Sequence, residues 1–139
     1  KTGSKLLPGA GRLLRALKTQ RYKLAVASNR PTVFSHIVMR HLEIRRYFDY
    51  VLCGDRVARP KPSPLMLRQI LTRFGARPSE ALYVGDMTID VMTGRRARVK
   101  TVAVTTGSSR RGELAALGPF AVIERVDQVL GVLRGLDRA

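Results

Sequence analysis

The sequence predicts an α/β fold: a Rossmann-like, three-layer α/β/α arrangement around a mainly parallel sheet. Short runs rich in β-branched residues alternate with amphipathic stretches along the whole chain, a pattern typical of parallel strands that are joined by helices. Several of these runs end in polar or glycine residues, as strands do before a loop. The length of 139 residues is enough for one hydrophobic core and not comfortably for two. We therefore expect residues 1–139 to form a single domain.

The first half of the chain predicts two helices and two strands. Leu13, Leu14 and Leu17 recur at helical spacing behind a proline. Further along, Val33 and Ile37 share one face of a second helix, together with His41 or Leu42. The predicted elements are, in order, a helix over 9–20, a buried strand over 23–28, a helix over 31–42 and a strand over 50–53.

The second half begins with the most clearly marked helix. Ser63 fits the N-cap, Pro64 the first helical position and Gly75 the position past the end. The buried stripe of this helix is expected to comprise Leu67, Leu71 and Phe74. The elements that follow are a strand over 81–85, a helix over 88–98, a strand over 101–105, a short helix over 111–117, a strand over 120–123 and a terminal helix over 126–136.

Composition excludes several classes of protein. Hydrophobic residues make up 45% and charged residues 26% of the chain, close to the average for globular domains, so the chain is neither disordered nor collagen-like. No apolar run approaches the roughly 18 residues that a membrane span needs, and the first seven residues do not form a signal peptide. Cys53 is the single cysteine and cannot form an internal disulfide. We therefore expect a protein of the reducing cytoplasm.

The charge balance is strongly basic. Lysine and arginine total 26 against ten acidic residues, for a net charge of +16. Such a field favours anions, including phosphate esters, nucleic acids and acidic membranes. The arginines are scattered, however, and aromatic residues are only 6% of the chain, too few for a base-stacking platform. Nucleic acid is therefore a weak candidate partner, and solvated arginine-rich faces explain the charge equally well.

Polar side chains gather where the predicted strands end. Ser28 and Asn29 end one strand, Lys61 lies in the loop after the next, and Asp86 ends a third strand with Asp90 one helical turn later. Ligands of open α/β sheets bind outside the carboxyl ends of the strands. A hydroxyl and an ammonium suit a phosphate, and two carboxylates are hard oxygen ligands that Mg²⁺ prefers. Each residue also has an ordinary explanation as a helix cap, a solvated loop residue or a helix-start acid.

The order and spacing of three segments resemble the later signature motifs of the haloacid dehalogenase superfamily, and most closely its phosphoglycolate-phosphatase-like branch. These segments are Val26–Asn29, Arg59–Pro64 and Tyr83–Asp90. The resemblance implies a Mg²⁺-dependent phosphatase, a hydrolase of phosphomonoesters that acts on a small phosphorylated substrate. It also implies the roles of the site residues. Ser28 would hold a phosphoryl oxygen, Asn29 would line the substrate site, Lys61 would neutralise charge on nucleophile and phosphate, Asp86 would coordinate Mg²⁺, and Asp90 would support the metal shell.

The family's nucleophile motif has no counterpart in this sequence. The resemblance implies an Asp-x-Asp motif on an earlier, central strand, whereas residues 1–27 contain no acidic residue. That strand would lie between the strands that end at Ser28 and at Gly85, so its absence predicts two unpaired sheet edges. We expect an incomplete core, inactive alone, that an N-terminal segment with the first strand and cap, or another chain, completes.

Two further expectations follow from the sequence. Arg98 stands where the family usually has a glycine in the left-handed conformation, which costs another residue roughly 1 kcal/mol. Asp55, which follows a strand, is the one remaining carboxylate expected near the functional edge.

A non-catalytic basic module that binds phosphate groups or another polyanion is the alternative function.

Overall fold

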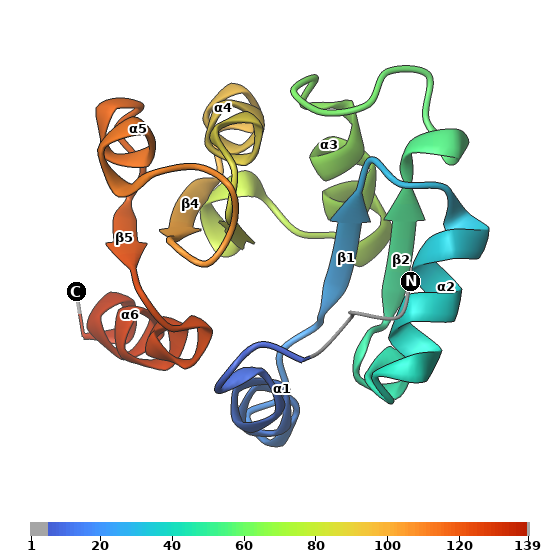
Figure 1. The fold of residues 1–139 in the computed structure, drawn as a ribbon, viewed down its shortest axis with the longest axis horizontal. Coiled ribbons are helices and arrows are strands. Elements are labelled where there is room, and N and C mark those ends of the chain that lie inside the picture. Colours follow the sequence, from blue (N-terminus) through green and yellow to red (C-terminus); the bar gives the residue numbers. More distant parts are fainter. Residues whose placement is uncertain (1–5, 139) are drawn as a thin grey trace.

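Five short strands, all paired in parallel, lie at the centre of the computed structural model, which describes residues 6–138 (Figure 1). The strands are β1 (Ala25–Ser28), β2 (Tyr50–Cys53), β3 (Leu82–Gly85), β4 (Lys100–Val104) and β5 (Ala121–Ile123). The helices are α1 (Ala10–Thr19), α2 (Thr32–His41), α3 (Leu65–Phe74), α4 (Thr88–Ala97), α5 (Arg111–Ala116) and α6 (Val129–Asp137). Strands and helices alternate as the sequence predicts, which confirms the α/β class.

The strands form two separate sheets. One has the order β1-β2 and the other β3-β4-β5. Within the described residues no strand is hydrogen-bonded between β1 and β3, so each of these two strands has one unpaired edge. This break agrees with the expected incomplete core.

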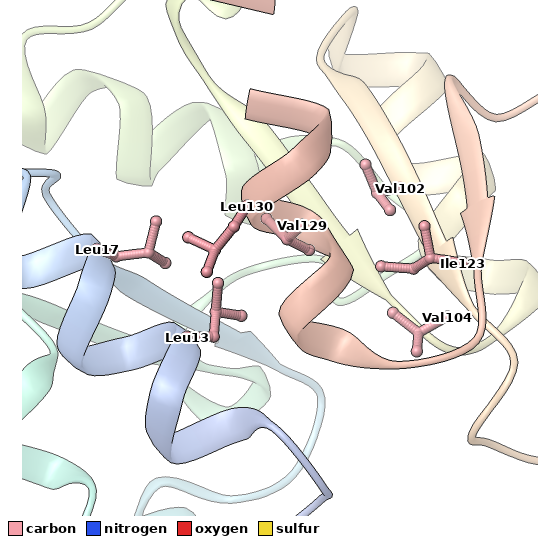
Figure 2. Packing of buried hydrophobic residues seen from close by; sticks show 7 residues of the cluster. All are labelled: Leu13, Leu17, Val102, Val104, Ile123, Val129 and Leu130. Carbon is pink, nitrogen blue, oxygen red and sulfur yellow. The ribbon is translucent and has the colours of Figure 1, made fainter. Parts of the chain in front are cut away.

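Helices cover both faces of the strands. In Figure 1, α3, α4 and α5 lie on one side of the strands, α1 and α6 lie on the other, and α2 lies beside β2. Below the strands, leucines of α1 face α6, and α6 lies between them and the side chains of β4 and β5 (Figure 2). The cluster comprises Leu13, Leu17, Val102, Val104, Ile123, Val129 and Leu130. A second cluster joins α3 to β2 and the end of α4, and partly buried side chains of both β1 and β3 pack against it. Side-chain packing therefore connects the two sheets where hydrogen bonds do not.

Val33 and Ile37 share one face of α2, as predicted, but this face is exposed. Val33 and Ile37 are 71% and 56% exposed, whereas Ser35 and Met39 are buried. Helical spacing alone gives two apolar-containing faces here, and α2 packs against β2 and the loops around it through the face with Ser35 and Met39. The expectation that groups Val33 with Ile37 identifies a helix face correctly but not a core face.

Both predicted helix ends with left-handed backbone are present. Gly75 closes α3 with φ 64°, and Arg98 closes α4 with φ 62°.

Helix α3 begins one residue later than expected, and the Ser63 hydroxyl accepts a hydrogen bond from the Leu65 amide at 3.2 Å. Strands β1, β3 and β5 are shorter than predicted by one or two residues. Within residues 6–138, three 3₁₀ helices that the sequence does not predict fill connections at Arg45–Tyr47, Gly54–Arg56 and Pro78–Glu80. A fourth, Val126–Gln128, forms the first turn of the predicted terminal helix. No helix within residues 6–138 has the length and apolar character to cross a membrane.

Candidate functional site

Lys61 lies at the centre of the polar groups that the strand ends bring together. Its ammonium Nζ donates hydrogen bonds to Asp90 Oδ1 at 2.7 Å, to the Tyr83 hydroxyl at 3.0 Å and to the Ala27 carbonyl at 3.1 Å. Ala27 belongs to β1 and Tyr83 to β3, so the Lys61 side chain bridges the two sheets at the break. Only 10% of the Lys61 side chain is exposed. A single buried cation thus connects both halves of the site.

Asp90 uses both carboxylate oxygens within the chain. Oδ1 accepts from Lys61 and from the Tyr83 hydroxyl at 2.9 Å, while Oδ2 accepts from the backbone amides of Asp86 at 3.1 Å and Met87 at 3.0 Å. A side chain at Gly85 would collide with the Asp90 carboxylate, so glycine is required for this close approach. Asp90 therefore fixes the turn from β3 into α4 and also holds Lys61.

Asp86 has the carboxylate that is open to a cation. It is half-buried, and no side chain among residues 6–138 donates a hydrogen bond to its carboxylate. Burial raises the pKa of Asp86 above its ordinary value, and the nearby charge of Asp90 raises it further, against the lowering effects of Lys61 and Arg30. A side chain at Gly107 would collide with the Asp86 carboxylate, so the loop after β4 lies close to it. A bound cation would offset the electrostatic cost of the Asp86 charge.

The residues around Asp86 fit Mg²⁺ better than a metal held entirely by protein. No group of three or more histidine, cysteine, aspartate or glutamate side chains within the described part of the chain is arranged to hold a metal ion. Mg²⁺ commonly keeps several waters and binds through one or two carboxylates. The Asp86 carboxylate, which accepts no side-chain hydrogen bond within residues 6–138, meets that requirement.

Ser28 ends β1, and Asn29 follows it at the same edge. The Ser28 hydroxyl accepts a hydrogen bond from the Arg30 amide at 3.2 Å. The Asn29 side chain pairs with the backbone of Lys61, donating to its carbonyl at 3.0 Å and accepting from its amide at 2.8 Å. Asn29 therefore positions the loop that carries Lys61, and Ser28 is next in sequence to Ala27, which Lys61 contacts. The expected substrate roles of Ser28 and Asn29 stay predictions.

The Asp55 carboxylate accepts hydrogen bonds from Thr32 at the start of α2. Its Oδ1 accepts from the Thr32 amide at 2.9 Å and from the Thr32 hydroxyl at 2.7 Å. These hydrogen bonds, the one from the hydroxyl above all, lower the pKa of Asp55. Asp55 thus joins the end of β2 to α2 and is held as a structural acceptor.

Tyr83 is the site residue that sequence reasoning missed. Its hydroxyl donates to Asp90 and accepts from Lys61. Burial and the adjacent Asp90 charge raise the pKa of Tyr83, so the hydroxyl stays protonated and can donate. The sequence presents Tyr83 only as an aromatic residue of a strand. The available signal was its position two residues before Gly85, the last residue of β3. Residues two apart in a strand lie on the same face, so Tyr83 shares a face of the sheet with the residue at the strand end.

The sequence matches the haloacid dehalogenase-like hydrolase family over residues 1–104, three quarters of the chain. The chain belongs to this family. The resemblance noted from the three motif segments is thereby confirmed, and the Lys61–Asp90–Asp86 arrangement is the form that those motifs take in this member of the haloacid dehalogenase-like hydrolases.

Individual relatives support the same assignment. The chain is 32% identical over 131 residues to a probable phosphatase, IndB, of Dickeya dadantii, an alignment that covers 94% of this chain and 57% of that protein. It is 30% identical to a phosphoglycolate phosphatase of Nitrosococcus oceani, over 94% of this chain and 58% of that protein. A crystal structure of a predicted phosphoglycolate phosphatase from Haemophilus somnus superposes with a TM-score of 0.88 at 28% identity, covering 92% of this chain and 57% of that one. The chain thus spans a little over half the length of these relatives.

Proposed function

We propose that this chain forms the phosphate- and metal-binding part of a Mg²⁺-dependent phosphomonoester hydrolase, similar to phosphoglycolate phosphatases, that acts on a small phosphorylated substrate. One observation carries the proposal: Lys61 links the end of β1 to Asp90 and, through it, to the turn that holds Asp86. Relatives named as phosphatases support the reaction class. A free, buried Cys53 agrees with a cytoplasmic location.

Each residue at this edge would have a separate role in binding a phosphate and its metal ion. Ser28 and the backbone amides at the start of α2 would donate to phosphoryl oxygens, because a helix N-terminus favours anions. Lys61 supplies buried positive charge beside them. Asp86 would hold Mg²⁺, and Asp90 would support the metal by fixing the turn that presents Asp86. When bound, Mg²⁺ neutralises charge on the phosphoryl oxygens.

Covalent phosphoryl transfer also needs an attacking carboxylate. Within residues 6–138, Asp55 is held by Thr32, Asp90 is saturated by four hydrogen bonds, and Asp86 is assigned to the metal. We propose that a strand filling the break between β1 and β3 brings the nucleophile to the edge. An N-terminal segment or another chain would supply that strand. The 139-residue chain alone is then expected to be inactive.

Hydrolysis of p-nitrophenyl phosphate tests the proposed reaction. The chain as written should show no Mg²⁺-dependent turnover, whereas a longer protein that includes a strand with a carboxylate at its carboxyl end should turn over. In that longer protein, Lys61→Ala and Asp86→Ala should abolish the activity. Turnover by the 139-residue chain that is lost in Asp55→Asn would contradict our view of the nucleophile.

Calorimetric titration with Mg²⁺ tests the metal site in the chain itself. We expect weak binding, because one candidate carboxylate ligand is absent, and its loss in Asp86→Asn. Asp137→Asn is the matched control, since it removes the same charge from an exposed residue near the end of α6. An equal Mg²⁺ response in both variants would remove Asp86 from the site. Salt-sensitive binding of polyanions that is independent of both Asp86 and Mg²⁺ would instead favour the non-catalytic module.

A further inference from the structure

The Ala27 carbonyl faces the unpaired edge of β1. On the other edge, the Leu24 carbonyl accepts from the Asp49 amide at 2.7 Å, and the Arg30 carbonyl accepts from the Gly54 amide at 3.3 Å, both on the β2 side. Backbone groups of successive residues in a strand point to opposite sides. The carbonyl of Ala27 therefore points away from β2, toward the break. Lys61 Nζ donates to this carbonyl at 3.1 Å.

The contact with the Ala27 carbonyl uses the third proton of the Lys61 ammonium. An ammonium has three protons and no acceptor capacity. Asp90, the Tyr83 hydroxyl and the Ala27 carbonyl take one hydrogen bond each. No Lys61 proton is left for an anion beside Ser28 while all three contacts persist. Lys61 then acts on a phosphate through its charge alone.

We propose that Lys61 is a latch that couples the open edge of β1 to anion binding at the strand ends. A strand that fills the edge donates its own amide to the Ala27 carbonyl, and Lys61 turns the released proton toward the anion. The Ala27 contact is the one that gives way, because a neutral carbonyl attracts the ammonium less strongly than the Asp90 carboxylate, which lies closer and carries the opposite charge. Strand binding and anion binding must then strengthen each other by the same factor. This inference rests on the proposed function, and it adds a control of the same site.

Removing one acceptor should mimic the release without any strand. Tyr83→Phe takes away the hydroxyl that accepts from Lys61 and changes neither charge nor ring size. In the 139-residue chain with Mg²⁺ present, we expect the affinity for inorganic phosphate to rise about threefold to tenfold, which corresponds to the net gain of about one hydrogen bond. Tyr50→Phe is the matched control, since its hydroxyl makes no hydrogen bond within residues 6–138 and it starts β2 at the far end. Its affinity should equal that of the unmodified chain.

The gain in phosphate affinity must depend on Lys61. In Lys61→Gln/Tyr83→Phe the increase should disappear, and thermal unfolding checks that each variant is folded. An unchanged or weaker affinity in folded Tyr83→Phe overturns the latch, and so does a gain that persists without Lys61.

Nuclear magnetic resonance of the unmodified chain provides a second test should Tyr83→Phe not fold. Saturating phosphate should move the Ser28 amide signal and leave the Lys61 side-chain nitrogen signal in place. A comparable shift of both signals overturns the latch alone. No shift of the Ser28 amide contradicts phosphate binding at this edge, and with it both proposals.

Discussion

Replacing Lys61 with methionine should destabilise the chain more than loss of an ordinary surface ion pair. The Lys61 and Asp90 side chains are 10% and 6% exposed and lie 2.7 Å apart. Removal of one partner of a buried pair costs about 3–5 kcal/mol. Asp90 keeps three of its four hydrogen bonds, those from Tyr83 and two amides, so we expect the lower end, about 3 kcal/mol. With an unfolding entropy of about 0.3 kcal/mol/K for a chain of this length, the melting temperature should fall by about 10 °C.

Thermal unfolding followed by far-ultraviolet circular dichroism measures this shift. Lys18→Met is the matched control, because Lys18 pairs with Asp49 at a similar 3.0 Å while the two side chains are 34% and 30% exposed. Exposed pairs contribute about 1 kcal/mol or less, so the control should lose no more than about 3 °C. Equal losses in the two variants, or a loss below about 3 °C in Lys61→Met, would refute the view that burial makes the Lys61–Asp90 pair strong.

Three further substitutions test individual features of the fold. Asp86→Asn should raise the melting temperature at pH 7 without Mg²⁺, because burial raises the pKa of Asp86 and so disfavours the charged folded form. The gain should shrink as the pH falls through that raised pKa and vanish below about 3.8, the ordinary value; a lower melting temperature at pH 7 would contradict it. Arg98→Gly should add about 1 kcal/mol to the free energy of unfolding in urea, since φ is 62° there; a loss would show that the Arg98 side chain itself is needed. Gly94→Ala should cost about 1–3 kcal/mol or more, because the new methyl would collide with the buried Thr101 hydroxyl, and Thr101→Ala in the same chain should recover part of the loss in urea unfolding.

Much of the site could be located from the sequence because parallel strands all end at one edge. Ser28 ends a strand and Lys61 and Asp86 each follow one, so the edge at which they are expected depends only on strand order and direction. The left-handed ends at Gly75 and Arg98 were equally accessible, since they depend on local backbone geometry. These features need no knowledge of which side chains meet across the core.

The contacts between elements were not accessible in the same way. Tyr83 contacts Lys61 and Asp90 only because three segments converge, and nothing in its local sequence distinguishes it from a core aromatic residue. Asn29 fits a substrate role and also a backbone-pairing role, and the structure shows the second. The α2 face was ambiguous because helical periodicity identifies faces and not the neighbour that covers one of them.

The packing of α1 has a consequence for the order of assembly during synthesis. The side chains that Leu13 and Leu17 pack against, such as Val129 and Leu130, are made more than a hundred residues after them. Domains tend to fold as units while they are made, and contacts between distant residues form slowly because a long loop must close first. The leucine face of α1 therefore lacks these partners until β5 and α6 emerge. Helix α1 is thus made well before this cluster can form around it.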